Sequence, residues 1–256
     1  MRRLIVNADD LGHSDAVNAA IFALMASGHV TSASLMMNAP AVEAAVREIA
    51  RFPGRSFGVH LNATDFPPLC RDAGLAVLCD GTGSLHTEWA RGRRHLPRRA
   101  RQAVFAEWCA QVERALALGV PVSHLDSHHH LHTHPSLFLV LKRVQRRFGI
   151  RRVRLARNLF AAGEHVRPGF AAGTAAWNLA LRTIYRTRTA DAFTAFRTFH
   201  ERAQNERTRA GLSWQGTLEL MCHPGGEMFA AETRLLASDW RETLAGGAEL
   251  ISYHEV

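Results

Sequence analysis

The sequence predicts an α/β fold, a distorted (β/α) barrel of about seven parallel strands. Two observations lead to this prediction. Short apolar runs rich in β-branched residues alternate with longer segments of helical periodicity, a pattern typical of βα units around a parallel sheet. Four of these runs also end in polar side chains, as expected where the carboxyl ends of barrel strands form a site. The chain has 256 residues without a linker or a fixed-period repeat, so we expect a single domain over residues 1–256.

Seven segments have the composition of buried strands. Each is short and apolar, and most are bounded by turn residues or polar clusters. In chain order they cover residues 3–8, 30–37, 56–61, 120–125, 153–156, 217–222 and 250–253.

Helical periodicity, with apolar residues three and four positions apart, falls between these strands. Helices are expected over residues 16–27, 41–51 and 101–118, and around residues 175–185 and 192–202. Pro135 is suited to the first turn of a further helix. Residues 66–101 combine Gly, Pro and Arg clusters without a clean period, which predicts a long loop or insertion near one end of the sheet. Residues 160–206 are also irregular in pattern.

Composition excludes several classes of protein. Hydrophobic residues make up 47% of the chain and charged residues 21%, which excludes a disordered chain, a collagen-like fibre and a disulfide scaffold. Cys70, Cys79, Cys109 and Cys222 form no CxxC pair, so neither a thiolate zinc site nor a redox pair is indicated. No apolar run reaches the roughly 18 residues of a membrane helix. The opening MRRLIVNADD is typical of a strand rather than a signal peptide, and we expect a cytoplasmic location with reduced thiols.

The charge balance is basic. Lys and Arg number 31 against 23 Asp and Glu, a net charge of +8, and Lys142 is the only lysine. Such an excess is typical of proteins that bind nucleic acid, an anionic membrane or an acidic substrate, and it also occurs on solvated surfaces. Aromatic residues are sparse between the arginines, so we expect no nucleic-acid partner. The arginine-rich residues 91–101 are candidates for the cleft mouth, for a peripheral contact with an anionic membrane, or for a solvated helix start.

Metal-competent side chains follow four of the predicted strands. Because the carboxyl ends of parallel strands share one face of a barrel, side chains far apart in the sequence would converge there. The clusters are Asn7, Asp9 and Asp10, then His60 and Asn62, then DSHHHLHTH from Asp126 to His134, and finally His223. Their coincidence indicates a site more strongly than any one cluster does.

Each cluster has more than one interpretation. On extended backbone Asp9 and Asp10 point in opposite directions, so one could bind a metal while the other takes a proton from water. Asp10 could instead cap a helix beginning near Gly12. His60, taken alone, is typical of a satisfied core histidine. His223, which precedes a Pro-Gly-Gly turn, is a candidate general acid.

The histidine segment is expected to contribute to a metal site, because neutral imidazole is the commonest nitrogen ligand of metals in proteins. On extended backbone His128, His130 and His132 would share one face and His129 would take the other. Asp126 could orient one of these imidazoles through a hydrogen bond.

Familiar motifs of other enzyme classes are absent from the sequence. There is no G-x-G-x-x-G opening a helix after a strand, no Walker lysine, no G-x-S-x-G elbow and no HExxH. Carboxylates together with imidazoles suit one divalent ion, magnesium or zinc, with open positions and a bound water. Because such an ion polarises a carbonyl or phosphoryl oxygen, hydrolysis is the expected reaction class.

Five sequence blocks resemble, in order, the signature blocks of the YdjC-like carbohydrate deacetylases, the ChbG/HpnK family. They are IVNADDLG, VTSASLMMN, GVHLN, HLDSHHHLH and ELMCHP, and VRLARN and the final ISYHEV also fit. The resemblance implies a distorted barrel related to polysaccharide deacetylases, a divalent metal, and removal of the acetyl group from an N-acetylated amino sugar. Leu11 stands where many members have Phe, and residues 160–206, a region that often shapes the sugar pocket, match no block.

The resemblance also implies a role for individual residues. The metal ligands would be Asp10, His60 and His128. Asp9 would be the base that activates water, and His223 the acid that protonates the leaving amine. Asp126, His130 and His132 would support the ligands, and Asn62, Arg154 and Arg157 would bind the substrate.

Alternative functions remain open at this point. A metal-dependent phosphoesterase would use similar ligands, and a nucleic-acid-binding protein would use the positive charge. Metal storage is disfavoured, because storage does not need Asp9 and His223 on separate strands. The implied substrate is an oligosaccharide or a glycolipid such as an N-acetylglucosaminyl hopanoid, and a homodimer is a candidate assembly.

Overall fold

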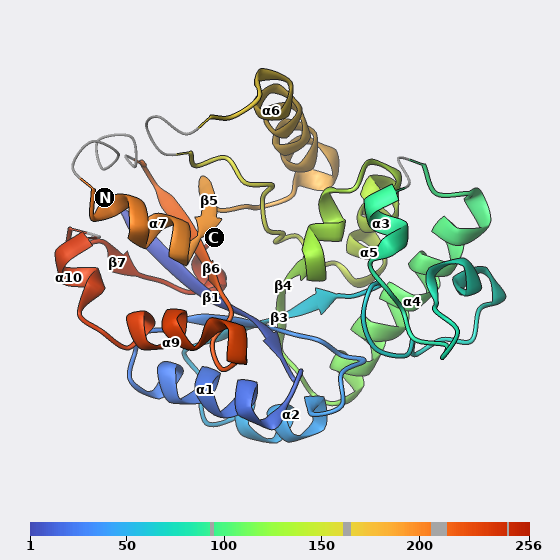
Figure 1. Ribbon diagram of the computed structural model, residues 1–256, viewed down its shortest axis with the longest axis horizontal. Coiled ribbons are helices and arrows are strands. Elements are labelled where there is room, and N and C mark those ends of the chain that lie inside the picture. The colour runs from blue at the N-terminus through green and yellow to red at the C-terminus, as the bar shows by residue number, and fades with distance from the viewer. Residues whose placement is uncertain (93–94, 161–164, 206–213, 245) are drawn as a thin grey trace.

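The computed structural model describes all of residues 1–256 except 93–94, 161–164, 206–213 and 245. It confirms the α/β class: the described residues form a seven-stranded, curled sheet in which all paired strands run parallel (Figure 1). The sheet order is β4-β3-β2-β1-β6-β5, and β7 also pairs with β1. The strands are β1 (Arg3–Leu11), β2 (Ser32–Leu35), β3 (Ser56–Leu61), β4 (Val122–Ser127), β5 (Ala192–Ala195), β6 (Thr217–Cys222) and β7 (Glu249–Leu250).

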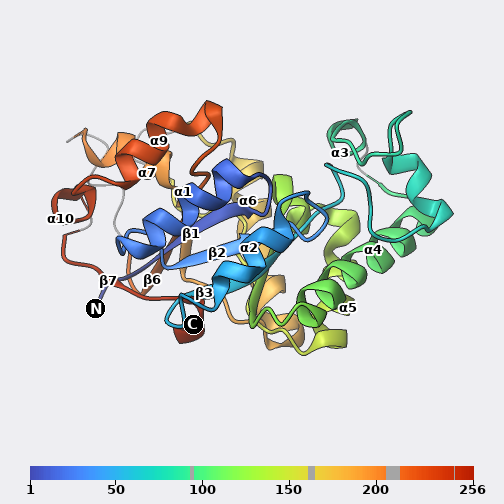
Figure 2. The same cartoon turned by 90° about the horizontal axis from the view of Figure 1, so that it is seen from below.

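Helices cover the outer side of the sheet. In Figure 2, α1 and α2 lie along β1, β2 and β3, while α4 and α5 pack together at the far edge. The helices are α1 (Asp15–Ala26), α2 (Val42–Ile49), α3 (Glu88–Gly92), α4 (Arg98–Ala117), α5 (Phe138–Phe148), α6 (Pro168–Thr183), α7 (Phe196–Ala203), α9 (Ala230–Leu236) and α10 (Trp240–Leu244). Short 3-10 turns add η1 (Ala73–Leu78), η2 (His128–Thr133), η3 (Pro135–Leu137), η4 (Ile184–Arg186), η6 (Glu227–Phe229) and η7 (Tyr253–Glu255).

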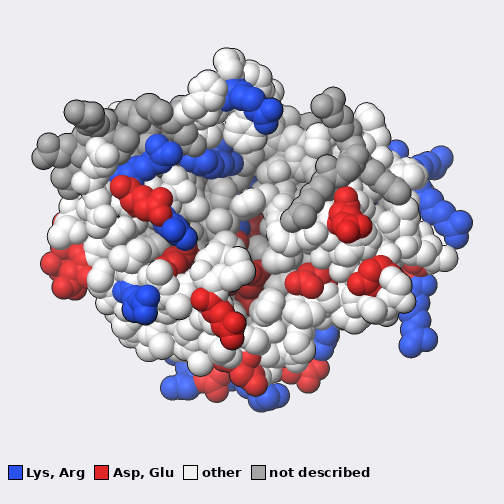
Figure 3. All heavy atoms as spheres, viewed as in Figure 1, with Lys and Arg blue, Asp and Glu red and all other residues white. Residues whose placement is uncertain are grey.

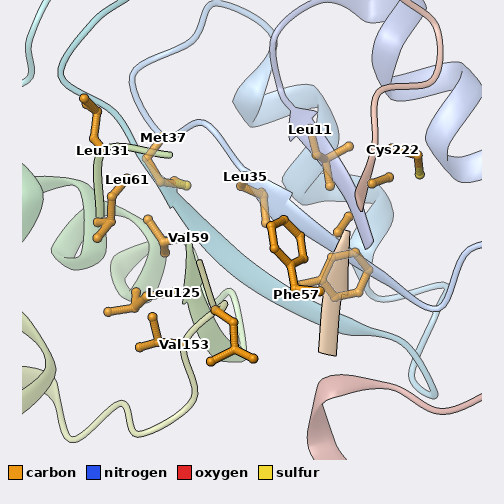
Figure 4. Close-up of a cluster of buried hydrophobic side chains, with 14 of the residues drawn as sticks. Leu11, Leu35, Met37, Phe57, Val59, Leu61, Leu125, Leu131, Val153 and Cys222 are labelled. Carbon is orange, nitrogen blue, oxygen red and sulfur yellow. The ribbon is translucent and has the colours of Figure 1, made fainter. Parts of the chain in front are cut away.

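The two faces of β1 have different surroundings. Leu4, Val6 and Ala8 belong to the large apolar cluster that also contains residues of α1 and α2. Figure 4 shows part of this cluster, in which Leu35 and Phe57 of neighbouring strands pack together. Side chains alternate along a strand, so Asn7 and Asp9 share the opposite, inner face of β1. Polar groups on that inner face carry the candidate site.

The predicted strand at residues 153–156 is wrong. Val153 makes only one isolated parallel bridge, to Leu125, and Arg152 makes another to Arg188. Beyond them, the backbone of Ala156 bonds to a side chain of α6 instead of a strand. The N–H of Ala156 donates to Oδ1 of Asn178 at 2.9 Å, and Nδ2 of Asn178 donates to the carbonyl of Ala156 at 2.9 Å. Because these groups are taken by α6, the sheet continues past β4 only as single bridges.

Two other segments differ from expectation. A helix was predicted over residues 192–202, but Ala192–Ala195 pair with β6 and α7 starts only at Phe196. Pairing at the sheet edge overrides the helical preference of alanine here. The last predicted strand, 250–253, is shorter and shifted, because Ser252 and Glu255 form a capping box that starts η7.

Smaller boundary changes matter for the site. β1 runs on to Leu11 and therefore includes both aspartates of the first cluster. The helix that follows begins at Asp15 and is capped by the Ser14 hydroxyl, so Asp10 does not serve as its cap. The predicted helix at 175–185 begins earlier, with Pro168 in the first turn of α6.

The described part of residues 66–101 is mostly irregular, as predicted, and contains η1, α3 and the first residues of α4. Of the arginines in the 91–101 stretch, Arg93 and Arg94 lie outside the described residues, whereas Arg98 and Arg99 are exposed at the start of α4. No described helix is both long and apolar enough to cross a bilayer.

Lys142 fastens the C-terminal end of α6 to α5. The residue is only 4% exposed. The ammonium donates to the carbonyls of Leu181 at 2.7 Å and Ile184 at 2.9 Å and to the hydroxyl of Thr187 at 2.6 Å. Burial lowers the pKa of Lys142 to about 8.

Candidate active site

Asp10, His60 and His128 come together from the ends of β1, β3 and β4 to form a candidate metal site. Oδ1 of Asp10 lies 3.3 Å from Nε2 of His60 and 3.0 Å from Nδ1 of His128. The three ligand atoms all lie within 4.8 Å of one another. Atoms bonded to one ion at about 2.0–2.2 Å are separated by roughly 3.0–3.5 Å, so the donor set and its spacing fit a single divalent ion.

The carboxylate of Asp126 orients the ring of His60. Its Nδ1 lies 2.8 Å from Oδ1 of Asp126, and the hydroxyl of Ser34 donates to the other carboxylate oxygen of Asp126 at 2.8 Å. The register of the sheet places Asp126 directly beside His60. A hydrogen bond to Nδ1 leaves Nε2 free to bind a metal.

The backbone of Asp10 has an unusual conformation. Its φ is +65°, in the left-handed region that aspartate adopts more readily than most residues. Extended backbone would have turned Asp9 and Asp10 to opposite sides. In the structure both carboxylates face His60, with Oδ2 of Asp9 3.9 Å from Nε2. The left-handed turn therefore adds Asp10 to the site without removing Asp9.

The site favours positive charge. Burial lowers the pKa of His60, but Asp126 and Asp9 outweigh it and raise the pKa to about 10. Burial raises the pKa of Asp10, but hydrogen bonds from His128 and His60 hold that pKa well below its usual range. The carboxylate of Asp10 thus stays ionised, and the negative charge at the candidate metal site attracts a cation. Figure 3 shows a hollow at the centre of this face with acidic atoms at its floor.

Arg154 holds Asp9 in place. Its two terminal nitrogens donate to the two carboxylate oxygens of Asp9 at 2.7 and 2.6 Å, and Asn7 donates to Oδ1 at 2.8 Å. Burial raises the pKa of Asp9, but Arg154 and His60 together outweigh burial and lower it. A bidentate pair of this kind fixes the plane of the carboxylate as well as its charge.

The same arginine reaches two more carboxylates. It lies 2.9 Å from Oδ2 of Asp126 and donates through Nε to Oε1 of Glu219 at 2.7 Å. The hydroxyl of Tyr253 donates to the other oxygen of Glu219. A chain of buried hydrogen bonds therefore leads from the C-terminal turn to Asp9.

The histidine segment does not have the extended backbone that was predicted. It forms the 3-10 turn η2, with left-handed φ values of +50° at His129 and +54° at His130. As a result His128, His130 and His132 do not share one face. The Thr64 hydroxyl lies 3.0 Å from Nδ1 of His129 and stabilises this turn.

The turn gives each histidine a different environment. His128 reaches Asp10, while His130 lies edge-on to Phe193 with ring centroids 5.8 Å apart. His132 is fully buried and bonds through Nδ1 to the Ser127 hydroxyl at 2.7 Å. Among the described contacts, neither His130 nor His132 bonds to Asp10, His60 or His128, so their expected support of a metal site stays a prediction.

His223 lies at the end of β6, on the other side of Asp9 and Asp10. These three residues line one cavity of about 310 Å³ together with Phe229. The imidazole stacks on Phe229 with centroids 4.9 Å apart, and the backbone N–H donates to Glu232 at 2.6 Å. The ring is held at the cavity wall.

The predicted substrate ligands divide into two groups. Asn62 and Arg154 are fully buried. The side chain of Asn62 bonds to Asn38 and to the backbone of Asp65. Both residues therefore hold the site together rather than face a substrate. Arg157 lines a separate cavity beside α6 and packs its guanidinium over Phe160 at 5.1 Å.

Sequence reasoning missed Ser34, Glu219 and Tyr253. Glu219 was detectable, because a carboxylate within the otherwise apolar TLELMC strand must find a partner when buried. Ser34 also stood out as a polar residue in a buried strand. The pairing of Tyr253 with Glu219 depends on tertiary contacts and had no sequence signal.

A curled parallel sheet with carboxylates and imidazoles at its strand ends defines an α/β half-barrel with a candidate metal site. Within that class, the chain belongs to the family of YdjC-like proteins, whose family model matches residues 3–245.

Two relatives are named carbohydrate deacetylases. One, from Geobacillus stearothermophilus, is 40% identical over 158 residues, which cover 61% of this chain and 62% of the relative. The other, from Halalkalibacterium halodurans, is 30% identical over 225 residues, which cover 87% and 84%. The first alignment thus spans less than two thirds of that relative's length.

A solved structure shares the fold. It is a protein from Enterococcus faecalis V583, named for cellobiose-phosphate cleavage, with a TM-score of 0.77 and 22% sequence identity. The match covers 99% of this chain and 98% of the other.

Proposed function

We propose that residues 1–256 act as one catalytic domain, a metal-dependent carbohydrate N-deacetylase that removes the acetyl group from an N-acetylated amino sugar. The observation that carries this proposal is the pairing of two carboxylates with different partners. Asp10 faces two imidazoles, whereas Asp9 faces a buried arginine. Carbohydrate deacetylases among the relatives support the choice of substrate class.

Asp10, His60 and His128 would hold the ion. A divalent ion bound there would lower the pKa of a bound water and polarise the acetyl carbonyl. Two imidazole donors favour zinc over magnesium, which prefers oxygen ligands.

Asp9 and His223 would move the protons. Asp9 lies beside the candidate metal site with its carboxylate plane fixed by Arg154, and it would take a proton from water. His223 lies across the same cavity and would deliver a proton to the leaving nitrogen, since an amine anion is too poor a leaving group. The products are acetate and the free amine of the sugar.

Acetate release tests this function directly. Protein purified with zinc should release acetate from chitooligosaccharides or from alkyl N-acetylglucosaminides, lose that activity with a chelator, and regain it when zinc is restored. The same preparation should release no phosphate from a phosphomonoester. Phosphate release without acetate release would replace the deacetylase with a phosphoesterase.

A further inference from the structure

A second cavity lies beside the candidate active site, between α6 and the carboxyl ends of β5 and β6. Its volume is about 550 Å³, within the range of about 300–1,000 Å³ typical of small-molecule sites. It is separate from the cavity that contains Asp9 and His223. The proposed deacetylation does not use it.

The inner wall of this cavity adjoins the site. His130 follows the candidate ligand His128 by two positions in η2, and Met221 precedes His223 by two positions on β6. Phe193 contacts both regions, since its ring packs against His130 and lies 5.1 Å from the Arg154 guanidinium carbon. A molecule whose acetyl group lies at the metal site can therefore extend into this cavity.

The described lining is mainly apolar and aromatic, and its polar side chains besides Trp177 are His130, Thr133, Arg157 and Thr174. Phe170 and Trp177 come from α6, and Phe193 and Met221 come from the strand ends. Trp177 is held by an edge-on contact with Phe138, with ring centroids 4.8 Å apart. The Thr174 hydroxyl is already used in a bond to the carbonyl of Phe170. The hydroxyls around the edge of a sugar ring would find few hydrogen-bond partners on such a wall.

Trp177 offers a hydrogen-bond donor to a ligand. Its Nε1 is buried and has no hydrogen-bond partner among the described residues. None of the described lining residues is acidic. The wall therefore suits an apolar group attached to a hydrogen-bond acceptor, such as a glycosidic or ester oxygen.

We propose that this cavity binds an apolar group carried by the amino sugar, so that the preferred substrate is an alkyl or aryl glycoside or glycolipid rather than a free oligosaccharide. This assignment rests on the proposed deacetylase function for the placement of the sugar. Binding of the apolar group itself is independent of that chemistry.

Gly173 offers a way to fill the cavity. It lines the wall on α6, and a Cβ built at this position meets no atom within 4 Å. Gly173→Leu would place an isobutyl group in the cavity and replace a poor helix former with a good one. Ala176→Leu is the matched control, because Ala176 is exposed on the same helix and does not line the cavity.

The probes are n-alkyl glycosides of N-acetylglucosamine and of glucosamine, from methyl to hexyl. KM is measured with the acetylated series, and Kd is measured by calorimetry with the deacetylated series, which needs no turnover. In the wild-type protein each buried methylene should lower both constants by about fourfold at most. Gly173→Leu should abolish this dependence while retaining turnover of the methyl glycoside, and Ala176→Leu should preserve it.

Two results would overturn the proposal: equal Kd for the methyl and hexyl glycosides in the wild-type protein, or an unchanged chain-length dependence in Gly173→Leu. Tighter binding of chitobiose than of the hexyl glycoside would also overturn it. If no acetylated sugar releases acetate but Kd still falls with chain length, the deacetylase function fails and the cavity assignment stands.

Discussion

Arg154 and Asp9 form a bidentate ion pair, with bonds of 2.6 and 2.7 Å, at a position where neither side chain is more than 2% exposed. Two parallel bonds hold the carboxylate in one plane, which a single point charge cannot do. The pair therefore determines in which direction Asp9 can accept a proton.

Replacing Arg154 tests that relationship. Arg154→Lys keeps one positive charge among Asp9, Asp126 and Glu219 but loses the fork, so kcat should fall by roughly 10- to 100-fold. Zinc content should stay near one per chain, because the proposed metal ligands are untouched. Circular dichroism confirms folding, and an unchanged kcat in the folded variant would show that the orientation of Asp9 is irrelevant.

The variant Asp9→Asn tests whether Asp9 acts as the general base or as a metal ligand. The amide cannot accept a proton, so kcat should fall by about 10²–10⁴-fold while metal content is retained. Elemental analysis alongside the kinetics makes the distinction. Loss of the metal in Asp9→Asn would mean that Asp9 is itself a ligand.

The metal assignment predicts a different pattern for the three ligands. His60→Ala, His128→Ala and Asp10→Ala should each lower zinc content as well as activity, because each removes one of the three donors. Asp126→Asn should weaken zinc binding by a smaller factor, about 10- to 100-fold in affinity, since it only orients His60. Full zinc occupancy in His60→Ala would contradict the assignment.

His223 should show its role through the leaving group. His223→Ala should lower deacetylation of the sugar amide by about 10²–10⁴-fold with zinc retained. Hydrolysis of an aryl acetate should suffer much less, because a phenolate leaves without a proton. Equal losses on amide and ester would reassign His223 to substrate positioning.

Sequence reasoning succeeded where strand ends decide the geometry. The limits of β3 and β6 were predicted residue for residue, and the convergence of Asp10, His60 and His128 follows from parallel strands sharing one edge. It failed where tertiary contacts decide. The left-handed backbone at Asp10, His129 and His130 has no local signal, and it changed which side chains share a face.

The buried His124 should make the free energy of unfolding depend on pH. It is buried in a parallel stack with Tyr253, with centroids 3.8 Å apart, and Asp126 and Asp9 face it with negative charge while Arg154 and His60 face it with positive charge. Burial dominates and lowers its pKa from 6.5 to about 3. Between these values the unfolded chain binds more protons than the folded one, so this contribution to stability is complete above pH 6.5 and is lost as the pH falls.

His124→Phe keeps the stack and removes the titration. Relative to this variant, the wild-type free energy of unfolding should fall by up to about 1.4 kcal/mol per pH unit below pH 6.5. Urea unfolding at several pH values measures the difference, in which other titrating groups cancel. Parallel pH profiles for the two proteins would show that His124 does not titrate on unfolding.

The attachment of α6 has a consequence for substrate choice. Asn178 fastens the middle of this helix and Lys142 its C-terminal end, whereas most residues from Pro168 to Gly173 are exposed. A bulkier apolar group can then be admitted by local opening of the N-terminal half, at less cost than disturbing the whole fold. Discrimination among apolar groups should accordingly be gradual, while discrimination at the rigid, buried carboxylates should be sharp.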